Sequence, residues 1–336
     1  MQRTDEISAF LARTKWASAE RRTIAGDASN RRYERLTDKD HGTAILMDAP
    51  PMKGEDVRPF VKIANHLLSI GLSAPKIYDA DESLGVLLIE DLGDALYARV
   101  LAKDDTAEMD LYQCAIDALL VAHKAAPPQN LSPYDADAMT ETALLSVDWY
   151  GAYGAEKVPT GQDRAALQQS VYQTLTEHMI GPTVLTQRDY HAENLIWLPD
   201  RDGPARVGLL DFQDAMLGDP AYDLASLLKD ARRDVSREVQ RATLERYCTE
   251  MNFERDRFSA SYAACSAQRN LRILGVFTRL CVRDGKPHYP DLLPRVWRNL
   301  QSDLQHPALR DLAKCVGPLL PNPSPDVIAK IKQSHV

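Results

Sequence analysis

A chain of 336 residues is long enough for one large two-lobed enzyme or two modest domains, and 44% hydrophobic with 26% charged residues is an ordinary soluble composition. No apolar run approaches the roughly 18 residues that a membrane-spanning helix needs, so the composition argues against a membrane protein. A formal net charge of −8 at pH 7 argues against a nucleic-acid-binding surface, although local dipoles and metal ions can still hold a nucleotide.

The first residues and the cysteines indicate where the protein works. Residues 1–20 alternate charged with small apolar side chains and lack the continuous apolar centre of a signal peptide, so we expect a cytoplasmic protein. The five cysteines are scattered and show neither C-x-x-C nor metal-ligand spacing, which favours reduced thiols in the core. Nothing in the sequence indicates an obligate protein partner.

The first part of the chain is expected to form a sheet. Residues 21–51 read as three strands separated by turns at GDASN and DKDHG, which predicts an antiparallel meander. Apolar residues at helical spacing from Val57 to Leu68 predict one helix, and Gly71 is placed to end it. Residues 74–93 add two strands around the turn DESLG, so we expect five strands and one helix.

The later part of the chain is expected to be a helical bundle. From residue 106 the apolar spacing becomes helical, with one face that runs from Tyr112 to His123. Further helices are predicted at residues 162–180, 220–233, 236–251, 257–283 and 291–304.

Between these parts, two short apolar runs flank the polar turn PDRDGPA and predict a small hairpin. Asn194 stands directly before the first run, and Asp211 follows the second. Asp and Asn side chains offer the hard oxygen ligands that suit Mg²⁺ held jointly by protein and substrate phosphates. The spacing D-x-x-x-x-N from Asp189 to Asn194, followed by a D-F pair at the end of a strand, is that of the kinase template.

This pattern indicates phosphoryl transfer, in which the protein positions an acceptor hydroxyl and neutralises charge on the migrating group. Asp189 is the expected base, and Asn194 and Asp211 are the expected metal ligands. A zinc site at His191 and Glu193 is not favoured, because no second histidine stands at H-x-x-H or H-E-x-x-H spacing.

The segment resembles the catalytic core of the aminoglycoside phosphotransferase and choline kinase superfamily. The stretches GDASNRRYERL, ILMDAPP, EDLG, TQRDYHAENL and LLKDARRDV together are similar to the bacterial N-acetylmuramate/N-acetylglucosamine anomeric kinases of cell-wall recycling. The resemblance spans most of the chain and implies an α+β, protein-kinase-like fold with a nucleotide-binding lobe at 1–92 and a helical, acceptor-binding lobe at 93–336. It also implies ATP, Mg²⁺ and phosphorylation of the anomeric hydroxyl of an amino sugar.

The resemblance assigns further residues by position. The turn over the nucleotide phosphates comprises Gly26, Ser29, Asn30, Arg31 and Arg32. The hinge that pairs with adenine contains Glu90 and Leu92. Independently of the resemblance, the candidate acceptor-binding residues are Trp149, Tyr150, Arg188, Gln213 and Arg269. Packing of a loop into the bundle explains Trp149 and Tyr150 equally well, and an amphipathic core helix is the favoured explanation for the segment with Arg269.

One position departs from the kinase pattern. The third strand of a kinase carries a lysine for the nucleotide phosphates, whereas this chain has Met47 there. Arg31, Arg32 and Lys53 are the alternatives for the missing charge, and the sequence does not choose among them. No long activation segment follows Asp211, which disfavours a protein substrate.

Some residues near the motifs have structural explanations. Asp219 before Pro220 is typical of a helix cap, and Asp223 one turn later is expected to brace the catalytic loop. His123 is expected to be a hydrogen-bonded core histidine.

Two other functions stay open at the level of sequence. One is an aminoglycoside- or choline-type kinase, and the other is a catalytically inactive nucleotide-binding scaffold, suggested by Met47. A cationic acceptor requires a pocket lined with carboxylates, whereas an acidic muramate favours Arg or Lys.

Overall fold

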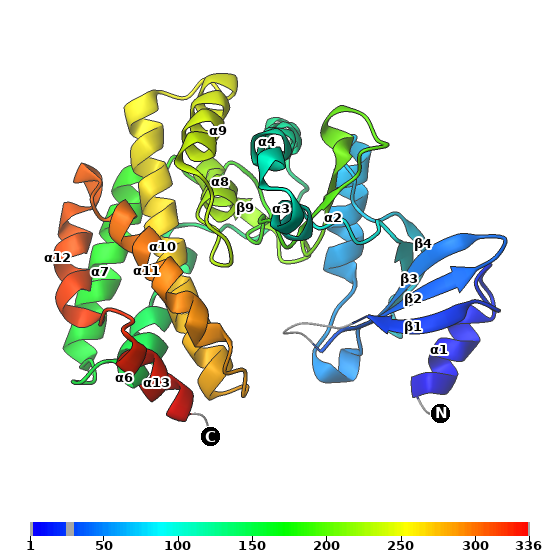
Figure 1. Ribbon diagram of the computed structural model, residues 1–336, viewed down its shortest axis with the longest axis horizontal. Coiled ribbons are helices and arrows are strands. Elements are labelled where there is room, and N and C mark those ends of the chain that lie inside the picture. The colour runs from blue at the N-terminus through cyan, green and yellow to red at the C-terminus, as the bar shows by residue number, and fades with distance from the viewer. Residues whose placement is uncertain (1–2, 25–29, 335–336) are drawn as a thin grey trace. The chain divides into compact units, whose positions relative to one another are not determined.

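The computed structural model describes residues 3–24 and 30–334 (Figure 1). By compactness the chain falls into two units, Met1–Ala122 with Glu193–Ala215 and His123–Ala192 with Met216–Val336. The functional division into lobes at 1–92 and 93–336 stays a prediction.

The first unit contains the predicted five-stranded antiparallel sheet. The strands, in spatial order, are β1 (Glu20–Ile24), β2 (Arg32–Asp38), β3 (Gly42–Asp48), β5 (Val86–Glu90) and β4 (Ile77–Asp81). Their turns fall where Gly, Asp and Asn cluster in the sequence, because these residues adopt turn conformations at low cost.

The two faces of this sheet differ because side chains alternate along each strand. One face packs against helix α1 (Arg3–Leu11) in a core that includes Phe10, Leu36, Leu46 and Leu88. Helix α1 was not predicted, because only three of its nine residues are buried and its apolar stripe is short. The other face carries Met47, which lies opposite Tyr33 in register.

Helix α2 (Arg58–Ser69) confirms the predicted helix of the first unit. It ends in a Schellman arrangement, in which Leu72 N donates to Leu67 O and Gly71 N donates to Leu68 O. Gly71 has φ +84°, the left-handed conformation that glycine adopts without strain.

The remaining strands of the first unit confirm the predicted hairpin. β7 (Leu195–Trp197) pairs antiparallel with β8 (Val207–Leu209). Helix α3 (Tyr97–Lys103) precedes α4 (Glu108–Lys124), a helix that continues into the second unit.

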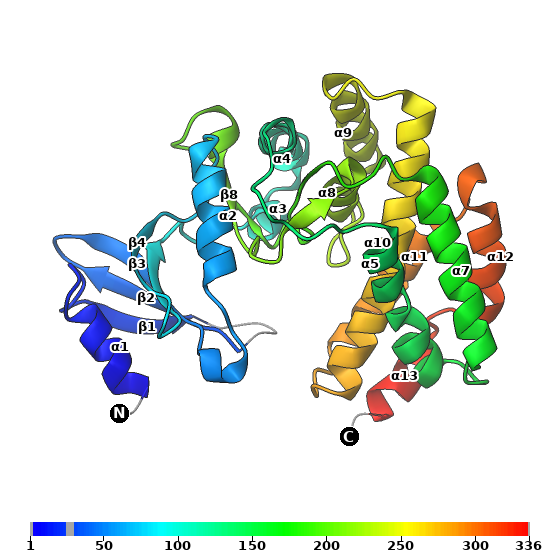
Figure 2. The same ribbon diagram turned by 180° about the vertical axis from the view of Figure 1, so that it is seen from behind.

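The second unit is mainly helical, as predicted. Its longer helices are α5 (Ala136–Ala143), α7 (Gly161–His178), α8 (Pro220–Leu228), α9 (Arg237–Glu250), α10 (Arg255–Val282), α11 (Leu293–Asp303), α12 (Arg310–Leu319) and α13 (Pro325–Gln333). Strands β6 (Val184–Thr186) and β9 (Met216–Gly218) form an antiparallel pair. Helix α10 is buried along most of its length and packs against α8 and α11, and both views show α11 beside it (Figures 1 and 2).

Two predictions about helices need correction. The helix predicted at 220–233 ends at Leu228, because the Asp230 carboxylate accepts a hydrogen bond from Arg232 N and so stabilises a turn instead of a further helical turn. The stretch SVDWYG was not predicted as helical and forms a π-helical turn, Ser146–Gly151, followed by the short helix α6 (Ala152–Gly154). Among the described residues, no helix combines the length and apolarity required to cross a bilayer.

Candidate active site

In the second unit, the predicted catalytic loop follows β6 and is held by Asp223. This carboxylate is fully buried in the first turn of α8 and accepts hydrogen bonds from Gln187 N at 2.6 Å and Arg188 N at 2.8 Å. Arg188 has φ +73°, an uncommon conformation for a residue with a side chain, and the Asp223 contacts hold it there. The predicted bracing role of Asp223 is confirmed.

Asp189 is a partly buried carboxylate among cationic side chains of its own unit. Burial raises its pKa, but Arg272, His191, Arg269 and Arg188 together hold the pKa of Asp189 below its usual value. Burial lowers the pKa of His191, so this imidazole adds positive charge only at acidic pH, and at pH 7 the arginines supply it. Asp189 is therefore ionised at physiological pH and can accept a hydrogen bond from a hydroxyl group.

Two predicted structural roles are confirmed, one at the start of α8 and one in α4. Asp219 caps the helix by accepting from Ala221 N at 2.8 Å, with Pro220 as the first helical residue. His123 is a buried core residue whose Nδ1 is hydrogen-bonded to the hydroxyl of Tyr247.

In the first unit, Asn194 and Asp211 lie at neighbouring ends of β7 and β8. The backbone oxygen of Asn194 accepts from Leu210 N at 3.0 Å, which fixes the two residues next to each other. Asp211 has φ +57°, a strained conformation for a residue other than glycine, and its side chain is exposed. Gln213 Nε2 donates to Asp211 Oδ1 at 2.6 Å and so orients the carboxylate.

These two side chains fit the requirements of Mg²⁺. A carboxylate and an amide oxygen are hard ligands, and Mg²⁺ in nucleotide enzymes needs only one or two protein carboxylates beside phosphates and water. Within residues 3–24 and 30–334, no group of three or more His, Cys, Asp or Glu gathers as a metal cage. Asn194 and Asp211 are in the first unit and Asp189 is in the second, so their joint role stays a prediction.

The described candidate nucleotide residues lie immediately before and at the start of β2, and at the end of β5 and just after it. Gly26 and Ser29 lie outside the described residues. Asn30 donates through its backbone N to Glu55 Oε1 at 3.1 Å, and Arg31 Nε lies 2.8 Å from Glu55 Oε2. Arg32 is exposed.

The predicted hinge is held by polar contacts on both sides. Glu90 pairs with Arg201 at 2.7 Å, and Leu92 is buried. Asp91 pairs with Arg35 of β2 at 2.7 Å. The backbone of this segment is thus fixed in position, as a surface that pairs with a flat base requires.

The candidate acceptor residues Trp149 and Tyr150 lie in the π-helical turn. Tyr150 is fully buried, and its hydroxyl donates to Pro321 O at 2.7 Å. Trp149 stacks on Tyr153 with ring centroids 5.8 Å apart. Both side chains thus have structural contacts in the bundle.

Asp230 was not predicted as a site residue, because it lay within a predicted helix. It is 1% exposed, and among the described residues its Oδ2 has no hydrogen-bond partner. Its charge acts on His191 and Arg269, as the charge of Asp189 does, which places these groups near one another. Arg269 is 3% exposed and its Nε also has no partner in the described part of the chain. Buried polar atoms of this kind are normally satisfied by a ligand or by water.

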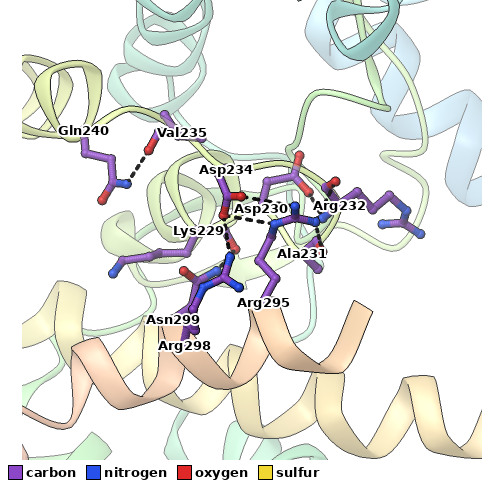
Figure 3. A network of polar contacts seen from close by, with 10 residues as sticks. All are labelled: Lys229, Asp230, Ala231, Arg232, Asp234, Val235, Gln240, Arg295, Arg298 and Asn299. Carbon is purple, nitrogen blue, oxygen red and sulfur yellow. Dashed lines mark hydrogen bonds and ion pairs between the residues drawn. The ribbon is translucent and has the colours of Figure 1, made fainter. Parts of the chain in front are cut away.

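The loop 229–235, which carries Asp230, is held by side chains of α11 (Figure 3). Arg295 Nη1 donates to the carbonyl oxygen of Arg232 at 2.9 Å, and Arg295 Nε lies 3.0 Å from Asp234 Oδ1. Asn299 Nδ2 donates to the carbonyl oxygen of Lys229, the first residue of the loop, at 3.3 Å. Because the contacts reach the backbone, α11 determines the path of the loop.

Comparison with known proteins identifies the family of this chain. The sequence profile of the phosphotransferase enzyme family matches residues 20–260. An N-acetylmuramate/N-acetylglucosamine kinase from Caulobacter vibrioides is 40% identical, over 91% of this chain and 93% of its own. The chain therefore belongs to the phosphotransferase enzyme family, and it is a kinase.

Two solved structures show the same fold at low sequence identity. A choline/ethanolamine kinase family protein from Mesorhizobium loti has a TM-score of 0.59 at 15% identity, over 99% of this chain and 100% of its own. An aminoglycoside phosphotransferase mutant in ternary complex with ADP and hygromycin B has a TM-score of 0.59 at 13% identity, over 90% and 99%. The fold is thus protein-kinase-like, as expected.

Proposed function

We propose that this protein is an ATP- and Mg²⁺-dependent kinase that phosphorylates the anomeric hydroxyl of N-acetylmuramate or N-acetylglucosamine in cell-wall sugar recycling. The observation that carries the proposal is the 40% identity, over nearly the whole chain, to a relative named as an N-acetylmuramate/N-acetylglucosamine kinase. The presence of Asp189, Asn194 and Asp211 at kinase spacing supports an active enzyme over an inactive scaffold.

Each residue then has a stated role. Asp189, ionised and held by the Asp223-braced loop, accepts the hydrogen bond of the acceptor hydroxyl and orients it for attack on the γ-phosphorus. Asn194 and Asp211 hold Mg²⁺, which when bound neutralises charge on the phosphate oxygens. The backbone of residues 90–92 pairs with adenine.

The charges around Asp189 favour an acceptor that is neutral or acidic. Three arginines, Arg188, Arg269 and Arg272, act on this carboxylate. They would repel the ammonium groups of choline or of an aminoglycoside, whereas they can donate to the carboxylate of a muramate. Asp230 Oδ2 is a buried acceptor suited to a sugar hydroxyl or an amide N–H.

The test is an acceptor screen with purified protein, ATP and Mg²⁺. N-acetylmuramate and N-acetylglucosamine are compared with choline and an aminoglycoside, and each reaction is repeated with EDTA. We expect ADP release only with the amino sugars and only with Mg²⁺. Loss of reducing-end reactivity in the product identifies the anomeric position, because a phosphate there prevents ring opening. Turnover of choline or aminoglycoside alone, or retention of the reducing end, would exclude the proposal.

A further inference from the structure

The structure lacks the usual phosphate-binding ion pair of kinases at its usual positions. In the kinase template, a lysine on the third strand is paired with a glutamate from the helix that follows. Here β3 carries Met47, which is 1% exposed, and α2, with the sequence RPFVKIANHLLS, contains no acidic residue. Both partners of the pair are therefore missing from the elements that normally supply them.

The register of β2 and β3 shows which cation can replace the lysine. Tyr33 lies opposite Met47, and residues directly opposite in an antiparallel pair project from the same face. Arg31 stands two residues before Tyr33 and is hydrogen-bonded to its side chain, so it lies on the same side. Arg32 projects from the opposite face of the strand and is exposed. Lys53 is exposed at the end of the short 3-10 helix Pro51–Lys53.

A carboxylate partner for Arg31 comes from the segment before α2. Arg31 Nε lies 2.8 Å from Glu55 Oε2, and the two side chains are only 13% and 12% exposed. Asn30 supports the pair, since its backbone N donates to Glu55 Oε1 and its Nδ2 donates to Lys53 O. The pair joins the start of β2 to the entry of α2, much as the lysine–glutamate pair joins a strand to a helix.

The same cluster is within electrostatic reach of the candidate metal ligand. Burial raises the pKa of the Tyr33 hydroxyl, Arg31 opposes this, and the carboxylates of Asp211 and Glu55 add to the increase. Arg31 and Asp211 thus both act on the pKa of Tyr33, and all three residues belong to the first unit. Arg31 and Asp211 therefore both lie close enough to the Tyr33 hydroxyl to act on it electrostatically.

We propose that Arg31 is the cation that binds the nucleotide phosphates in this chain and that Glu55 positions it, in place of the lysine–glutamate pair that Met47 and α2 do not supply. The inference rests on the proposed use of Mg²⁺ and ATP, and it assigns the residues that hold the phosphates. A guanidinium suits this role because it carries five N–H donors and stays charged, so it can donate to a phosphate while it is paired with a carboxylate. The alternative is that the pair only fastens the turn before α2 to β2.

The test compares binding of Mg-ADP and of adenosine, which lacks phosphates, by calorimetry. In Arg31→Met we expect ADP affinity to fall by about 10- to 100-fold, the effect of a lost charged hydrogen bond, while adenosine affinity stays within about twofold. Glu55→Gln should lose roughly fivefold in ADP affinity, and Arg31→Lys should recover part of the Arg31→Met loss. The matched control is Arg21→Met, which breaks an Arg–Glu pair of the same sheet, Arg21 Nε to Glu34 Oε2 at 2.7 Å, and should leave both affinities unchanged.

Two results would overturn the assignment. Equal losses for ADP and adenosine in Arg31→Met, with a lower melting temperature, would make the pair a structural fastener. Unchanged ADP affinity in a folded Arg31→Met protein would place the phosphate-binding charge elsewhere. A wild-type protein that binds Mg-ADP but phosphorylates no amino sugar would instead contradict the proposed function and leave Arg31 assigned.

Discussion

Asp189 combines two properties that a phosphoryl-transfer base needs, a fixed backbone and a side chain that is ionised at physiological pH. Asp223 fixes the loop, and the arginines of the second unit keep the carboxylate ionised. Replacing Asp189 by Asn keeps the shape but removes the charge and the ability to take a proton. We expect turnover to fall by about 10²–10⁴-fold with Mg-ADP affinity nearly unchanged. Steady-state kinetics and calorimetry measure both, and full activity of Asp189→Asn would show that the role is misassigned.

Asp223 permits a second prediction at the same scale. Its two oxygens accept from two successive backbone N–H groups, so Asp223→Ala removes the acceptor of one buried and one partly buried donor. We expect the free energy of unfolding to fall by about 2–4 kcal/mol. Each donor that loses its acceptor costs about 1–3 kcal/mol, and entry of water offsets part of this cost. The control is Asp214→Ala, an exposed carboxylate in the loop that follows β8. Urea unfolding of both variants checks this, and similar small losses in the two would refute it.

Among the elements, those with strong periodicity were predictable and those defined by tertiary contacts were not. The strands of the first unit, α2 with its Gly71 end and the β7–β8 hairpin follow from alternation, spacing and turn residues. The overlong prediction for α8 failed because a side chain, Asp230, competes locally with the helix.

The residues of the candidate site likewise divide into those that the sequence could identify and those that it could not. Asp189, Asn194 and Asp211 lie in one short segment, so their spacing in the sequence marks them. Glu55 and Asp230 come from separate loops, and only the folded chain shows which side chains they approach. Residues of that kind leave no pattern in a single sequence.

The contact between α11 and the loop 229–235 leads to a prediction at this scale. Arg295→Met removes donors from the loop backbone and should let Asp230 move away from its position near Arg269. We expect kcat/KM for the acceptor to fall roughly 10-fold or more, because small displacements of positioning groups are costly, while KM for ATP changes little. The control is Arg298→Met, because Arg298 Nη2 donates at 3.0 Å to the exposed side chain of Asp234 and not to the loop backbone. Equal effects of the two variants, or an effect on ATP alone, would contradict this role.

At the scale of the whole molecule, the helical unit contains an ionisable group that makes its stability depend on pH. Asp303 of α11 is buried against α10, where Ser266 and Asn270 donate to it and Lys229 lies 3.5 Å away. Burial outweighs these partners and raises the pKa of Asp303 to about 6. At a pH between 3.8, the ordinary pKa of this side chain, and about 6, Asp303 holds a proton in the folded protein that it has released in the unfolded chain. The contribution of Asp303 to stability is therefore present at low pH and is lost as the pH rises through about 6.

This dependence can be isolated by comparing the wild type with Asp303→Asn, because other titrating groups are common to both proteins. On going from about pH 7.5 to about pH 4.5, the difference in unfolding free energy should shift by about 2 kcal/mol in favour of the wild type. Urea titrations followed by circular dichroism report mainly on the helical unit and give this difference directly. A difference that does not change with pH would mean that the Asp303 carboxylate is ionised in the folded protein down to its ordinary pKa. In that case Lys229, with Ser266 and Asn270, compensates fully for the burial of the charge.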